Sequence, residues 1–122
     1  MRRSDSMEAK ECVFCKIIEK KIPSKIVFED EGAVAIEDVN PQAPVHILIV
    51  PKRHLISLLD IDGAEGDEIV RLFSIIPKLA RLKGIAERGF RTVINSGKEA
   101  GQTVFHLHIH LLGGRPFHWP PG

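Results

Sequence analysis

Three histidines alternate with apolar residues in the segment His106-Leu107-His108-Ile109-His110. A period of two is that of a β-strand, so the imidazoles are expected to share one face, about 6.6 Å apart along it. Neutral imidazole is abundant near pH 7 and is nucleophilic without a separate base, which suits attack on phosphorus. The flanked central ring, His108, is the candidate nucleophile. On this motif alone a structural row and a three-histidine metal site stay open, because imidazole is the commonest metal ligand.

The polar segment before the histidines offers a place to hold an anion. Residues 95–103 read Asn-Ser-Gly-Lys-Glu-Ala-Gly-Gln-Thr and include two glycines whose backbone N–H groups could wrap phosphate oxygens, Gly97 and Gly101. The segment matches neither the P-loop nor the dinucleotide-binding glycine pattern, and in isolation an ordinary hairpin connection is the better explanation. Its position directly before the histidines is what favours phosphate binding.

A second constellation is the pair Cys12-x-x-Cys15, which has the spacing of half a zinc site. His54 and His106 could complete a Cys2His2 set. The spacing alone fits two buried free thiols equally well. A thioredoxin-like redox pair is disfavoured, because no βαβ pattern surrounds the cysteines.

Two more polar residues lie near a predicted strand start. His46 could support the nucleophile's ring, and the carboxylate of Asp38 could accept hydrogen bonds from ribose hydroxyls. From the sequence alone, a strand-end histidine and a turn-initiating aspartate are the simpler explanations.

Composition restricts the class of protein. The chain has 122 residues, which suits one domain with its own core. Its 17 Lys and Arg residues nearly balance 16 Asp and Glu residues, leaving a net charge of +1 and no basic stripe for nucleic acid. No apolar stretch approaches a membrane span, no signal-peptide core is present, and two cysteines do not make a secreted disulfide framework. We expect a cytoplasmic protein without nucleic-acid or membrane partners.

The elements that would position these residues follow from apolar periodicity. We expect a flexible N-terminal arm over residues 1–11 and a single domain over residues 12–122. The predicted strands cover residues 25–29, 33–37, 46–51, 90–95 and 105–112, the first two forming a hairpin, and a short amphipathic helix covers residues 12–19. The sum is an α+β fold: a five-stranded antiparallel sheet with one long and one short helix.

The long helix is predicted over residues 65–82. One apolar stripe at helical spacing defines it, made of Ile69, Leu72, Phe73, Ile76, Leu79 and Ala80. Pro77 lies inside this stripe, removes a backbone donor and clashes with the preceding turn. A kink at Pro77, or two abutting helices, is therefore expected.

Residues 106–112, His-Leu-His-Ile-His-Leu-Leu, resemble the signature of the histidine triad (HIT) superfamily. Five other segments are similar to its Hint branch: Phe-Cys-Lys-Ile-Ile (14–18), Ile-Pro-Ser-Lys-Ile-Val-Phe-Glu-Asp (22–30), Pro-Gln-Ala-Pro-Val-His (41–46), Pro-Lys-Arg-His (51–54) and Gly-Gly-Arg-Pro-Phe-His-Trp-Pro-Pro-Gly (113–122). The resemblance extends over roughly residues 12 to 122, nearly the whole chain, and the co-occurrence of these motifs is very specific.

This resemblance implies a homodimer of small α+β subunits that binds purine nucleoside monophosphates and hydrolyses adenosine phosphoramidates to an amine and the monophosphate. It implies that His108 becomes nucleotidylated, that His110 and His46 flank and support it, and that Asp38 binds ribose. The residues implied around the α-phosphate are Asn95, Gly101, Gln102, Thr103 and Val104, with His108 and His110 also touching the nucleotide.

Thr103 marks a departure from the Hint branch, which commonly has serine there. Its hydroxyl could still relay a proton to the leaving amine, although a threonine rotamer is stiffer. The loop over residues 99–104 is more similar to the branch that hydrolyses dinucleoside polyphosphates, so that activity is the enzymatic alternative. A nucleotide- or zinc-binding interaction protein without turnover is the non-enzymatic one.

Some members of the superfamily bind zinc through a comparable pair of cysteines and two histidines. The resemblance therefore implies a structural zinc held by Cys12, Cys15, His54 and His106, all present in this chain. Such a site would make His106 structural, leave the chemistry to His108, and argue against a catalytic three-histidine metal site.

Overall fold

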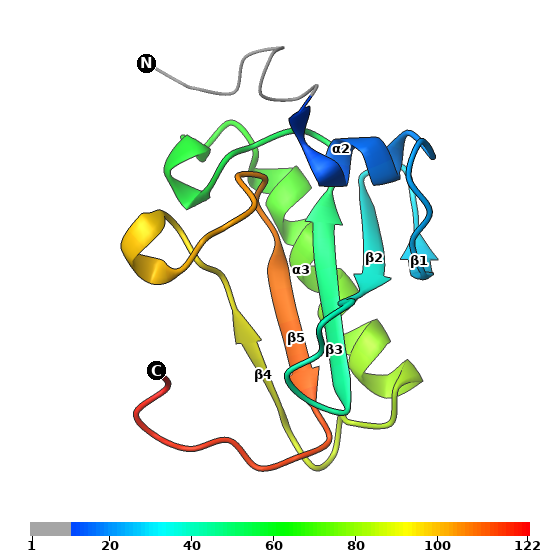
Figure 1. Ribbon diagram of the computed structural model, residues 1–122, viewed down its shortest axis with the longest axis vertical. Helices are drawn as coiled ribbons and strands as arrows, with labels where there is room; N and C mark the ends of the chain where they lie inside the picture. The colour runs from blue at the N-terminus through cyan, green and yellow to red at the C-terminus, as the bar shows by residue number, and fades with distance from the viewer. Residues whose placement is uncertain (1–10) are drawn as a thin grey trace.

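The computed structural model describes residues 11–122, so the arm expected over residues 1–11 falls outside the described range except for Glu11. Five strands form one antiparallel sheet in the order β1-β2-β3-β5-β4 (Figure 1). Their bounds are β1 Ile26–Glu29, β2 Ala33–Glu37, β3 Val45–Pro51, β4 Phe90–Val93 and β5 Ile109–Gly113. With a short helix α2 (Val13–Ile18) and a long helix α3 (Gly66–Leu82), the predicted α+β fold is confirmed.

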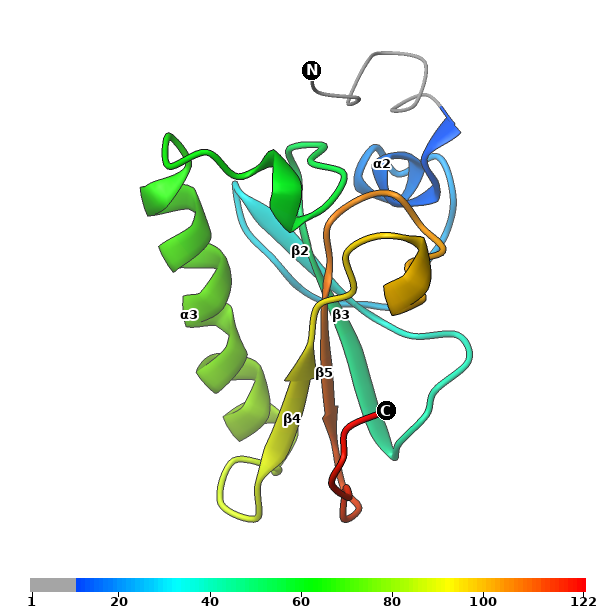
Figure 2. The ribbon, with the colours of Figure 1, turned by 90° about the vertical axis from the view of Figure 1, so that its left-hand side faces the viewer.

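The helices lie on opposite faces of the sheet (Figure 2). On one face, α3 packs against strand residues that include Ile47, Ile49 and Ile109. On the other face, α2 contributes Phe14 and Ile17 to a cluster containing Val34, Ile36, Leu48 and Val50. His110 pairs with Leu48 across β3 and β5, and cross-strand partners point to the same face. The histidines therefore lie on the α2 face, away from the long helix.

Helix α3 departs from the predicted apolar stripe at Phe73, and Ile69 is only half-buried. Its buried residues are Leu72, Ile75, Ile76, Leu79 and Ala80, whereas the side chain of Phe73 is 44% exposed. Ile75 is buried instead of Phe73, because the helix face that packs on the sheet is centred between Leu72 and Ile75.

The helix also runs without interruption through Pro77, so the alternative of two abutting helices is wrong. Pro77 lies on the exposed side, where water can solvate the Phe73 carbonyl that loses its donor. Among residues 11–122, no helix combines the length and apolar character needed to cross a membrane.

The last strand begins later than predicted. β5 starts at Ile109 rather than residue 105, so His106 and His108 precede the sheet. The β3–β5 ladder ends at the pair Ile49 and Ile109. Pro51 has no N–H to extend it, and its carbonyl accepts from His106 Nε2 at 2.7 Å. β4 likewise ends at Val93, two positions before Asn95.

Candidate active site and metal centre

His46 and His110 lie side by side on β3 and β5, with His46 Nε2 2.9 Å from His110 Nδ1. The backbone N–H of Gln42 donates to His46 Nδ1 at 3.0 Å, so this nitrogen carries no proton. The His46 proton is therefore on Nε2, between His110 Nδ1 and Asp38 Oδ2, the latter 3.4 Å away. Since His110 accepts at Nδ1, neutral His110 keeps its own proton on Nε2.

This assignment decides what the group of Asp38, His46 and His110 can do. The three ligand atoms lie within 4.8 Å of one another, as a metal site would require. A metal at His46 Nε2 would displace the proton there, while Nδ1 already accepts from Gln42. The three side chains therefore form a hydrogen-bonded chain and are not suited to bind a cation.

The orientation of His108 is fixed by a backbone bond. Its Nδ1 donates to the carbonyl oxygen of His106 at 2.7 Å, which leaves a lone pair on Nε2. The Phe14 ring meets it edge-on at a centroid distance of 5.0 Å, and the His110 ring lies 4.9 Å away. Only 8% of the residue is exposed. Among the described residues, however, Nε2 of His108 is not one of the fully buried side-chain atoms that lack a hydrogen-bond partner. Nε2 is thus the nucleophilic nitrogen that remains accessible.

All three of these imidazoles are held neutral. Burial lowers the pKa of His108, although its bond to the His106 carbonyl partly opposes this. Burial, followed by the neighbouring His108 and His46, lowers the pKa of His110 to about 4. Burial also lowers the pKa of His46 despite the opposing charge of Asp38. At neutral pH the Nε2 lone pair of His108 is therefore free for attack.

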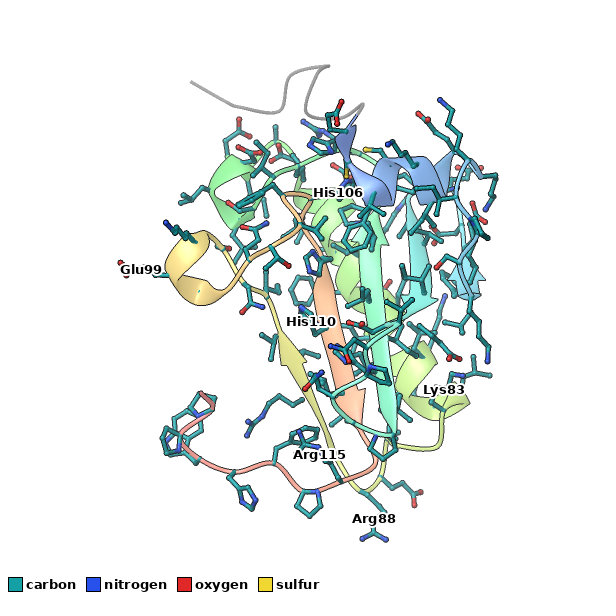
Figure 3. All side chains as sticks on the ribbon, in the orientation of Figure 1. Lys83, Arg88, Glu99, His106, His110 and Arg115 are labelled. Carbon is teal, nitrogen blue, oxygen red and sulfur yellow. The ribbon has the colours of Figure 1, made fainter. Side chains whose placement is uncertain are left out.

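The loop before the histidines contains a short 3-10 turn, η2 (Lys98–Ala100), flanked by Gly97 and Gly101 with φ of 93° and 90°. Glycine is favoured at both positions because side chains rarely adopt such positive φ values, and not because of crowding, since a Cβ would meet no atom within 4 Å. Figure 3 shows Glu99 projecting away from the sheet at this turn. Within residues 11–122, the backbone N–H groups of Thr103 and Val104 have no protein acceptor. They are available to hydrogen-bond an anion.

The other predicted nucleotide residues are arranged as follows. Asn95 lies two positions after Val93, the last residue of β4, which pairs with His110 on the histidine face. Asp38 forms the turn that its residue type suggests, accepting from Asn40 N at 2.8 Å, while its other oxygen faces His46. The Thr103 side chain is exposed. Gln102 differs from the rest, because it is buried and bonded to backbone groups.

The four predicted metal ligands come together at the other end of the histidine row. Cys12 Sγ lies 3.3 Å from His106 Nδ1, Cys15 Sγ lies 3.2 Å from His54 Nδ1, and the two Nδ1 atoms are 3.1 Å apart. A tetrahedral zinc with ordinary bond lengths separates its ligand atoms by about 3.3–3.8 Å. This cluster of Cys12, Cys15, His54 and His106 could therefore bind a metal ion.

Two further observations support that fit. His106 donates from Nε2 to the Pro51 carbonyl and so presents the Nδ1 lone pair to the cluster, as an outer-shell partner of a metal ligand does. Burial and the neighbouring Cys12 raise the pKa of Cys15 to about 12. Without a cation the Cys15 thiol is protonated at neutral pH, whereas a bound metal would take it as a thiolate and release the proton.

Comparisons with known proteins show which family the chain belongs to. The model of the HIT domain family matches residues 19–117. This chain belongs to the HIT family. Among its relatives, the purine nucleoside phosphoramidase of Escherichia coli K12 is 43% identical over 108 residues, covering 88% of this chain and 91% of that protein. An uncharacterised HIT-like protein of Synechocystis is 49% identical over 114 residues, covering 93% of this chain and 99% of its own.

Solved structures place the chain among HIT family hydrolases. A HIT family hydrolase from Legionella pneumophila superposes with a TM-score of 0.89 at 43% identity, covering 91% of this chain and 99% of that one. A histidine triad protein from Clostridium difficile gives a TM-score of 0.86 at 43% identity, with 97% of both chains covered. The resemblance and the fold expected from it are both confirmed.

Sequence patterns did not identify three contacts in the site of this HIT protein. Phe14, Gln42 and Pro51 hold the rings of His108, His46 and His106 respectively. The only available signal was the position of Phe14 between the two cysteines on an amphipathic helix. The other two act through backbone atoms, which every residue type possesses.

Proposed function

We propose that this HIT protein hydrolyses purine nucleoside phosphoramidates, of the adenosine 5′-phosphoramidate type, through a nucleotidyl intermediate on His108. The observation that carries the proposal is the bond from His108 Nδ1 to the His106 carbonyl, which keeps the accessible Nε2 unprotonated. The relative named purine nucleoside phosphoramidase, 43% identical to this chain, supports the substrate class.

In the first step, the Nε2 lone pair of His108 forms a bond to the α-phosphorus, and the bond from phosphorus to the leaving nitrogen breaks. The departing amine needs a proton, which we assign the Thr103 hydroxyl to relay from a solvent water, so that the hydroxyl receives one proton as it gives up another. The N–H groups of Thr103 and Val104, together with His110 Nε2–H, stabilise the charge that develops on the phosphoryl oxygens.

In the second step, a water molecule attacks phosphorus and displaces His108, whose Nε2 regains its lone pair. The attacking water leaves its oxygen and one proton on the phosphate and returns its other proton to solvent, which balances the proton relayed in the first step. Asp38 would bind the ribose hydroxyls, with Asn95, Gly101 and His110 lying around the phosphate. None of these contacts involves the base, so they do not distinguish adenine from guanine.

We also propose that Cys12, Cys15, His54 and His106 hold a structural zinc ion. The converging donor atoms and the Nε2–H bond of His106 to Pro51 support this assignment. Zinc there would link α2 to the segment that carries His108 and so supply folding free energy, with no part in the transfer steps.

A homodimer is the assembly we propose. β4 is an edge strand of the sheet, and an uncovered edge is a template for pairing with a second copy. Phe90 on that strand is 39% exposed. Light scattering should give twice the 13.6 kDa chain mass. A species of single-chain mass throughout the micromolar range would contradict it.

Dinucleoside polyphosphate hydrolysis is the second candidate activity. The observation that favours it is Thr103, in a loop similar to that of the corresponding branch. The decisive experiment compares kcat/KM for adenosine 5′-phosphoramidate and a diadenosine polyphosphate on one preparation. We expect the phosphoramidate to be preferred; a preference for the polyphosphate would replace the proposal, and adenosine monophosphate binding without turnover of either would indicate the non-enzymatic alternative.

A further inference from the structure

Gln102 lies in the loop beside the active site, yet its side chain faces the protein. The residue is 5% exposed. Its Nε2 donates to the carbonyls of Ile56 at 2.6 Å and Val104 at 3.1 Å, and its Oε1 accepts from Gly97 N at 2.8 Å. Both amide protons are thus in use. A direct contact from this amide to nucleotide phosphate would require breaking its bond to the carbonyl of Ile56 or Val104.

These bonds close the loop on itself. Gln102 N donates to the Gly97 carbonyl at 3.1 Å, while Gly97 N donates to the Gln102 side chain at 2.8 Å. The pair of bonds encloses the turn η2, in which Gly101 N bonds to the Lys98 carbonyl at 3.0 Å. The loop is therefore a closed ring of hydrogen bonds that ends immediately before Thr103.

The Gln102 side chain also connects this hydrogen-bonded loop to residues 55–56. Ile56 follows Leu55, which is fully buried and whose carbonyl accepts from Leu107 N at 2.6 Å. Leu107 stands between His106 and His108. Two successive carbonyls of one segment thus hold both parts of the site: Leu55 holds the histidine segment, and Ile56 holds the loop through Gln102.

We propose that Gln102 is a positioning residue that sets where the N–H groups of Thr103 and Val104 stand relative to His108 Nε2. The inference rests on the proposed function, because it assigns those groups to the phosphoryl oxygens. Donors that are already in place stabilise a transition state without reorganisation, and small displacements of them weaken catalysis strongly. Gln102 acts through the backbone and touches no substrate.

The test uses two replacements of similar length in the full-length protein. Gln102→Met removes all three side-chain bonds, and Gln102→Glu keeps an acceptor but loses the donors to Ile56 and Val104 while ionised. We expect kcat to fall about 10- to 100-fold in both, with KM changing less than threefold, since the residue positions groups that act on the transition state.

The pH profile distinguishes positioning from general support of the fold. A buried carboxylic acid has a raised pKa, and its protonated form regains one donor for the Ile56 carbonyl. Relative to the unsubstituted protein, kcat of Gln102→Glu should therefore recover as pH falls from 8 to 5.5, whereas that of Gln102→Met should not. A flat ratio for the Glu variant would overturn the proposal, as would a rise in KM with kcat unchanged, which indicates direct binding.

Leu72→Ala is the matched control, since Leu72 packs on the α3 face of the sheet. It should lower the melting temperature while leaving kcat within a factor of two. A fall in kcat as large as that of the Gln102 variants would show that Gln102 only stabilises the fold and would overturn the proposal. Hydrogen exchange of the Gly97 amide tests the ring without substrate. It should accelerate in Gln102→Met, and unchanged protection would refute the proposed contact. Absence of turnover in the unsubstituted protein would instead count against the proposed function.

Discussion

His108 Nδ1 lies 2.7 Å from the carbonyl oxygen of His106, and this one contact links the two halves of the histidine row. His106 directs its ring into the cysteine cluster and its carbonyl to the neighbouring imidazole. The ring of His106 therefore belongs to a structural centre, while its backbone fixes which nitrogen of His108 can attack. Any substitution that displaces the backbone of residue 106 should alter the orientation of the His108 ring.

Replacing His108 by Asn should reduce phosphoramidate turnover by at least about 10⁴-fold, because the nucleophilic nitrogen is removed. Binding of adenosine monophosphate should persist, since the loop N–H groups and Asp38 remain. Steady-state kinetics and calorimetric titration measure the two effects separately. His118→Asn is the matched control, because His118 is exposed in the tail, and it should retain activity. Full activity in His108→Asn would refute the assignment.

The tautomer of His46 depends on a backbone donor, which gives a second prediction. Gln42→Pro removes the N–H that donates to His46 Nδ1, so the His46 proton can move to that nitrogen. His110 would then have to donate from Nδ1 and would lose its Nε2 proton. We expect kcat to fall about 10- to 100-fold. Gln42→Ala keeps the backbone N–H and should behave like the unsubstituted protein; equal loss in both variants would show that the side chain, not the tautomer, matters.

The acid limb of the pH profile gives a third prediction. Burial lowers the pKa of His108 below its ordinary value of 6.5, so the free nucleophile persists below that pH. The logarithm of kcat/KM should therefore stay level on acidification through pH 6.5 and bend downward only below it. Phe14→Ala exposes the ring and should move the bend upward toward pH 6.5. A bend at or above pH 6.5 in the unsubstituted protein would contradict the lowered pKa.

Metal content gives a fourth prediction. The double variant Cys12→Ser/Cys15→Ser should lose about one zinc per subunit by elemental analysis and should melt at a lower temperature. Because the thiols must lose protons to bind a metal, zinc affinity should weaken as pH falls. His118→Asn should keep its metal. A zinc content unchanged in the double variant would exclude this ligand set.

The sequence predicted the sheet and its functional face well, because alternation and turn residues are local signals. Asp30 begins the β1–β2 hairpin as its type suggests, accepting from the backbone N–H groups of Gly32 and Ala33. The two-residue period correctly indicated the face of the sheet on which His110 lies with His46. The predicted start of that strand at residue 105 was wrong, because β5 begins at Ile109. There Leu107 N bonds to Leu55 instead of to the sheet, a tertiary contact that no local pattern encodes.

The contacts that fix protonation could not be predicted for a different reason. The N–H of Gln42 and the carbonyls of Pro51 and His106 are backbone groups, so their residue types say nothing about which imidazole nitrogen they meet. Phe73 shows the same limit in the core: helical spacing allows it in the stripe, but the axis of α3 over the sheet selects Ile75. Ring orientation and helix rotation depend on tertiary packing.

Trapping the intermediate tests the central claim most directly. Full-length protein is mixed with adenosine 5′-phosphoramidate, quenched under denaturing alkaline conditions within the first turnover, and analysed by peptide mass spectrometry. We predict one adenosine monophosphate group, attached to the peptide that contains His108 and absent in His108→Asn. Turnover with the nucleotide attached to another residue, or rapid turnover with no attached nucleotide at any quench time, would contradict it.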